Sequence, residues 1–94
     1  MTTLQLVKLS LRIVTNEFDD ELNGLINACK TDLGIAGVIV PDGLDDIVNL
    51  AVCTYCKMHF GNPDNYPRLK ASYDEQKAQL SMAFSLGYTD SYYG

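Results

Sequence analysis

Two of the three cysteines and the single histidine stand three residues apart along the chain, as Cys53, Cys56 and His59. Thiolates and imidazole bind zinc, and Cys29 or a carboxylate could complete a tetrahedral ligand set. On an α-helix, however, each three-residue step turns the side chain by about 300°, so three successive positions drift around the helix instead of converging. We therefore interpret the pattern as buried thiols beside a histidine at a helix end, and we predict no metal and no other cofactor.

The acidic pairs Asp19–Asp20 and Asp45–Asp46 are the other candidates for a catalytic or cation-binding site. Adjacent helical side chains point about 100° apart, and both pairs fall where helices are expected to begin. Carboxylates there interact with the positive end of the helix dipole, which explains them without catalysis. His59 has no identifiable orienting partner, and the sequence contains no glycine-rich phosphate-binding motif and no nucleophile motif. The sequence thus predicts a protein that is not an enzyme.

The charge of the chain disfavours nucleic acid and membrane surfaces as ligands. Its 94 residues include 7 basic and 12 acidic side chains, which give a net charge of -5 and a pI near 4.5. Such a chain is poorly suited to neutralise phosphates or to adhere to anionic lipid. A DNA-binding helix-turn-helix is disfavoured as well, because the candidate recognition segment 44–60 has Lys57 as its single cation.

The segments that target proteins to membranes or for secretion are not visible in the sequence. No run approaches the roughly 18 to 20 apolar residues of a membrane span. The N-terminus has neither a basic leader nor a small-residue cleavage site, and an odd number of cysteines indicates reduced thiols. We expect a cytoplasmic protein without membrane contact.

The length of the chain predicts one small domain, over residues 1–86. Its apolar spacing predicts four helices. The first covers about 4–11 behind a cap at Thr2 or Thr3, and the second begins at Thr15 or Asn16 and ends at a capping Gly34. The fold class is therefore all-α.

The third and fourth helices complete this prediction. The third begins at Asp42, Asp45 or Asp46 and ends near Phe60, with apolar residues on nearly every side, so we expect it to be the buried central helix. A Gly-rich loop over 34–43, with a short extended segment, precedes it. The fourth covers about 66–85 and has a narrow apolar stripe and a broad charged face.

Some apolar residues exceed what one small core needs. Leu6, Leu9 and Ile13 lie off the stripe of the first helix, and Val38 and Ile39 stand in the Gly-rich loop. We predict that these five residues contact a neighbouring subunit in a head-to-tail manner.

A flexible C-terminal tail is predicted over residues 87–94, because this segment has no helical period and ends in glycine. It contains Tyr88, Tyr92 and Tyr93. Tyrosine is a frequent interface anchor, so we expect these three side chains to bind a partner.

The sequence resembles the small head-tail connector proteins of long-tailed bacteriophages, also called adaptor or DNA-packaging proteins, over TNEFDDELNGLINACKTDLGIAGV (15–38) and TYCKMHFGNPDNYPRLKASYDEQKAQLSMA (54–83). The landmarks of the family stand here as the acidic D-D-x-L start of a helix at Asp19, Asp20 and Leu22, the aromatic end of a buried helix at Tyr55 and Phe60, and a charged helix at 66–79. These landmarks are packing and capping patterns rather than catalytic motifs.

The resemblance implies a virion protein at the head-tail interface, assembled in the host cytoplasm. It implies a homo-oligomeric ring of about twelve copies below the portal protein. Such a ring extends the DNA channel and connects the capsid to a stopper or tail-completion protein, and DNA passes without specific binding. The resemblance also assigns the C-terminal tyrosines to portal binding. The alternative is a small acidic helical regulatory or binding protein that acts as a monomer or dimer, and a metal-binding enzyme fragment ranks third.

Overall fold

The computed structural model describes residues 2–35, 46–61 and 63–85, and the side chains of these segments except those of 35 and 83–85. Within them the chain forms four helices: α1 (Thr3–Leu11), α2 (Asp19–Ile35), α3 (Asp46–His59) and α4 (Tyr66–Ser85). The predicted all-α class and helix number are confirmed, and no strand occurs among the described residues. The Gly-rich loop with Val38 and Ile39, and the tail with its tyrosines, lie outside the described residues.

Helix α1 begins at a reciprocal capping box, in which Thr2 and not Thr3 is the cap. The backbone N–H of Gln5 donates to Thr2 Oγ1 at 3.1 Å, and the backbone N–H of Thr2 donates to Gln5 Oε1 at 2.8 Å. The helix ends at Arg12, whose left-handed conformation (φ 61°) lets its amide donate to the carbonyls of Leu9 and Lys8. Both ends of this nine-residue helix are therefore fixed by local hydrogen bonds.

Helix α2 begins at Asp19, three or four residues later than the predicted start at Asn16 or Thr15. The Asn16 side chain points to the preceding helix, where its Oδ1 accepts a hydrogen bond from Lys8 Nζ at 2.8 Å. Lys8 Nζ also lies 2.9 Å from Asp19 Oδ1, which ties α1 to the start of α2. At the other end, the prediction that Gly34 caps the helix is wrong, since α2 continues to Ile35.

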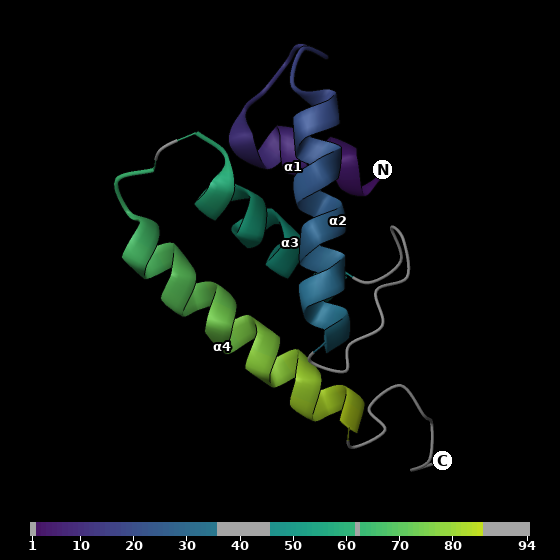
Figure 1. The fold of residues 1–94 in the computed structure, drawn as a ribbon, viewed down its shortest axis with the longest axis vertical. Coiled ribbons are helices and arrows are strands. Elements are labelled where there is room, and N and C mark those ends of the chain that lie inside the picture. Colours follow the sequence, from purple (N-terminus) through teal and green to yellow (C-terminus); the bar gives the residue numbers. More distant parts are fainter. Residues whose placement is uncertain (1, 36–45, 62, 86–94) are drawn as a thin grey trace.

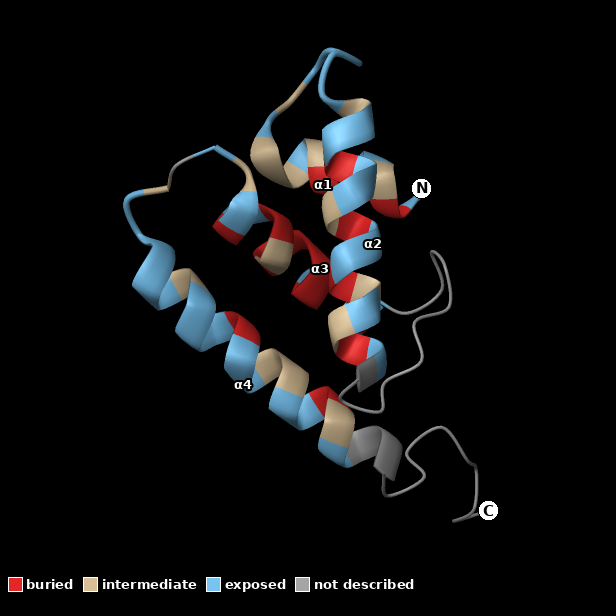
Figure 2. Ribbon diagram, in the orientation of Figure 1, coloured by how far each residue is buried: buried red, intermediate tan, exposed pale blue. Residues whose placement is uncertain are grey.

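Helix α3 lies at the centre of the domain and contacts the other three helices (Figure 1). Figure 2 shows that most of its residues are buried, as the sequence predicts. The expectation of burial on every side is wrong at its first turns, where Ile47 is 55% and Leu50 is 59% exposed. The buried side chains of the core are Val7, Leu22, Ile26, Cys29, Leu33, Val48, Ala51, Val52, Cys53, Cys56, Met58, Tyr73 and Leu80.

Helix α4 packs along α3 and is tied to α2 by a polar cluster around Tyr73. The Tyr73 hydroxyl donates to Asp32 Oδ2 at 2.7 Å, and Lys77 Nζ donates to the same oxygen at 3.1 Å. The hydrogen bond from Tyr73 lowers the pKa of Asp32 despite the opposing effect of burial. The Cys29 sulfur lies 3.6 Å from the Tyr73 hydroxyl, so the cluster joins two helices by side chains alone.

Candidate functional site

The cysteines and the histidine of the predicted pattern lie in different surroundings: the cysteines are buried and the histidine is exposed. Cys53 and Cys56 are buried free thiols, and burial raises the pKa of Cys56 to about 12. His59 is exposed, and its ring lies 4.4 Å from the ring of Tyr55 and 6.2 Å from that of Tyr66. Across residues 2–35, 46–61 and 63–85, no three His, Cys, Asp or Glu side chains are placed to hold a metal ion. A chain without bound metal stays a prediction, which elemental analysis of the purified protein can test.

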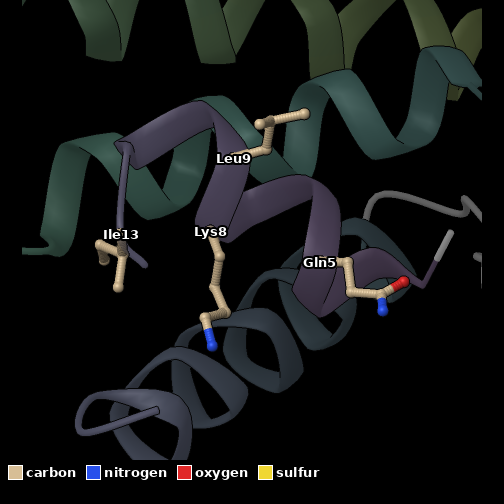
Figure 3. Close-up of a pocket in the computed structure, with 4 residues that line it drawn as sticks. All are labelled: Gln5, Lys8, Leu9 and Ile13. Atoms are coloured by element: carbon tan, nitrogen blue, oxygen red, sulfur yellow. The ribbon is translucent and has the colours of Figure 1, made fainter. Parts of the chain in front are cut away.

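The predicted contact residues Leu6 and Leu9 of α1, and Ile13 just after it, lie at two different grooves. Leu9 and Ile13 line a groove of about 530 Å³ together with Gln5 and Lys8 (Figure 3). Leu9 is 66% exposed, although it is a large aliphatic residue. Lys8 points away from Leu9 toward α2, where Asp19 neutralises its charge. This α1 groove thus offers an apolar surface whose one cation is already paired.

Leu6 lies at a second groove, between α1 and the first turns of α3. This groove of about 230 Å³, the acidic-end groove, is lined by Leu6, Asp46, Asn49, Leu50 and Cys53. Sequence reasoning placed Leu50 in the core and so missed it as a surface residue. The signal that could have revealed it is its spacing of four residues from Asp46, which puts both on the same face of α3.

A third groove, of about 360 Å³, lies where α1 and α3 end. This basic-end groove is lined by Ser10, Leu11, Arg12, Lys57, Phe60, Pro63, Asn65 and Leu69. Both of its cations are exposed, in a chain whose net charge is -5. From the sequence, Lys57 counts only as evidence against DNA binding, and Arg12 has no predicted role.

The arrangement as a whole suits contact between proteins. The three grooves are open and shallow, and the exposed leucines Leu9 and Leu50 line two of them. Exposed aliphatic side chains of this kind mark interaction surfaces when they occur together. The described part of the chain contains no helix that is long and apolar enough to cross a membrane.

Comparison with known proteins agrees with a contact role. A family model described as "Phage connector protein" matches residues 3–86, a range that includes all four helices. No curated protein and no solved structure matches the chain.

Proposed function

The chain belongs to the phage connector protein family, and we propose that it forms a ring of about twelve copies below the portal protein of a filled capsid. Membership makes it a structural component of the virion with a head-tail connector role in general terms. The ring would extend the DNA channel and present a platform for a stopper or tail-completion protein. The observation that carries this proposal is the family match over nearly the whole described domain.

The charge of the chain supports the proposed channel. DNA that moves through a protein ring must not adhere to its wall. A protein with 12 acidic and 7 basic side chains has a net charge of -5, which repels phosphates overall. DNA would then pass without specific binding.

The apolar surface of α1 supports contact between subunits. Leu6, Leu9 and Ile13, together with Val38 and Ile39, form the proposed contact. Leu9 is exposed in the described fold, and its burial against a neighbour would contribute on the order of 25 cal/mol per Å² of apolar surface removed from water. Such burial also compensates for the small core of a 94-residue chain.

Replacing Leu9 with glutamate should prevent ring formation on the portal while leaving the fold intact. The side chain is 66% exposed, so the carboxylate costs little in the monomer but would be desolvated in the contact. The matched control is Val14→Glu, since Val14 is 94% exposed and lies outside the grooves. Light scattering of each variant, alone and with purified portal, measures assembly. If the Leu9 variant assembles as well as the control, Leu9 has no part in the subunit contact.

Removal of the C-terminal tail should weaken attachment to the portal. The tail carries Tyr88, Tyr92 and Tyr93, which we propose as the portal-binding residues. Truncation after Leu86 should leave the circular dichroism spectrum unchanged and weaken portal affinity at least tenfold, or about 1.4 kcal/mol. Calorimetry with full-length and truncated chains measures the difference. Equal affinities would place the portal contact on the helical body instead.

A further inference from the structure

Helices α1 and α3 lie side by side and run in the same direction (Figure 1). Near their first turns, Thr3 Oγ1 donates a hydrogen bond to Asn49 Oδ1 at 3.1 Å. Near their last turns, Leu11 and Lys57 line the same groove. We call the surface along these two helices the seam, with the acidic-end groove at its start and the basic-end groove at its finish.

One face of α3 gives the seam a direction. Asp46, Leu50, Cys53 and Lys57 follow the spacing i, i+4, i+7 and i+11, which places them on one side of the helix. Along the seam the residues therefore change from acidic through apolar to basic. Asp46 and Lys57 are separated by about 16 Å, because an α-helix rises about 1.5 Å per residue.

The acidic end contains a polar atom that lacks a partner. Asn49 is only 3% exposed, and its Nδ2 donates no hydrogen bond to any described residue, although its Oδ1 is bonded to Thr3. A buried donor without an acceptor is unfavourable, so this amide favours a ligand that brings an oxygen into the groove. The groove, at about 230 Å³, is smaller than the roughly 300–1,000 Å³ of small-molecule sites. It suits one side chain and a peptide carbonyl from another protein.

The basic end offers the complementary groups. Arg12 and Lys57 are exposed and make no ion pair within the segments that the structure covers. Asp46 at the other end is likewise exposed and has no cationic partner among those segments. Arginine is well suited to such a contact, since its planar guanidinium binds a carboxylate through two hydrogen bonds.

We propose that adjacent copies of this chain join through unlike ends of the seam. Arg12 of one copy pairs with Asp46 of the next, Lys57 lies beside them, and a main-chain carbonyl from the basic end accepts the hydrogen bond from Asn49 Nδ2. This inference rests on the proposed ring and names the residues that set its direction. It adds a polar contact to the apolar contact of Leu6 and Leu9.

The order of charges selects the geometry of this contact. An end-to-end contact of like ends would place Asp46 against Asp46, or cations against cations, and would be repulsive. Unlike ends attract, and repeated head-to-tail contacts form a ring when the rotation between neighbouring copies closes on itself. The contact also covers Arg12 and Lys57, which would otherwise attract the phosphates of passing DNA.

Charge reversal at the two ends tests the proposal. The variants are Asp46→Lys, the pair Arg12→Glu with Lys57→Glu, and all three changes together. Each of the first two should lower ring formation on purified portal at least tenfold, because like charges then meet at every contact. The triple variant should assemble, as should an equimolar mixture of the first two, since unlike ends meet again. Glu75→Lys and Arg68→Glu, both on the exposed face of α4, are the controls and should assemble like the unmodified chain.

The outcomes separate this inference from the proposed function. An unmodified chain that forms no ring with portal contradicts the proposed function and this contact with it. Two results would overturn only the seam contact, provided that the unmodified chain forms rings. One is that Asp46→Lys forms rings equally well, and the other is that the triple variant does not form rings. Circular dichroism and thermal melts of every variant exclude unfolding as the cause, and a variant that is unfolded is replaced by Asp46→Asn or Arg12→Gln with the same expected direction.

Discussion

Replacing Val52 with aspartate should unfold the domain. Val52 lies in α3 and is fully buried in the core. The variant would therefore place an unpaired carboxylate there. The expected loss is about 4 to 5 kcal/mol or more, from a total of about 5–15 kcal/mol for a domain of ordinary stability. The helical circular dichroism signal and the cooperative melt should both be lost at neutral pH.

The matched control for this variant is Leu50→Asp. Leu50 lies two residues earlier on the same helix and is 59% exposed, so its replacement with aspartate should leave the thermal midpoint nearly unchanged. Comparison of the two melts separates burial from helix propensity. A cooperative melt of Val52→Asp close to that of the control would mean that α3 is not the centre of the core.

Replacing Tyr73 with phenylalanine should have the second-largest effect on stability. The variant keeps the buried ring and its edge contact with Tyr55 at 5.2 Å, but removes the hydroxyl that donates to Asp32. A hydrogen bond to a charged group contributes about 1.5–3 kcal/mol, which is the expected decrease in the free energy of unfolding. Chemical denaturation at neutral pH measures this change.

The same variant should also change the pH dependence of stability. The hydrogen bond from Tyr73 lowers the pKa of Asp32 in the folded state below its ordinary value of 3.8. Folding thus favours the ionised form, so this stabilisation is present above 3.8 and is lost as the pH falls through the folded pKa. Tyr73→Phe should lose less stability over that acidic range than the unmodified chain does.

The control for Tyr73→Phe is Tyr66→Phe. Tyr66 lies on the same helix and is 37% exposed, and its hydroxyl forms none of the side-chain hydrogen bonds found in the described segments. It should change neither the free energy of unfolding at neutral pH nor its acid dependence. If Tyr73→Phe behaves like this control, the cluster between α2 and α4 does not stabilise the fold.

The helices were predictable from sequence because local spacing sets them. The stripe that includes Leu22, Ile26 and Leu33 predicts α2, and these three side chains are buried as expected. The errors arise where a distant side chain competes with a local one. Asn16 does not start α2, and its side-chain oxygen instead accepts a hydrogen bond from Lys8 of the preceding helix. The burial of Leu50 was overestimated because the apolar spacing of α3 does not show which of its faces the other helices cover.

The candidate site was predictable only in part. The sequence predicts that Leu6, Leu9 and Ile13 exceed the needs of the core. Leu9 is exposed, whereas Leu6 and Ile13 are half-buried and pack against the core. The grooves themselves depend on the parallel arrangement of α1 and α3, which no local pattern specifies. The Tyr73–Asp32 hydrogen bond joins residues 41 positions apart and has the same cause. The spacing of residues within one helix predicts which of them share a face. The grooves between helices depend on how the helices pack, which spacing does not show.

The most direct test of the connector role is the number of chains that bind one portal assembly. Purified chain and portal protein are mixed, and the mass of the complex is measured by light scattering and by electron microscopy. We expect a closed ring of about twelve chains on the portal, even if the free chain is monomeric. A chain that remains a monomer or dimer and does not associate with the portal would contradict the account and favour a small helical regulatory or binding protein.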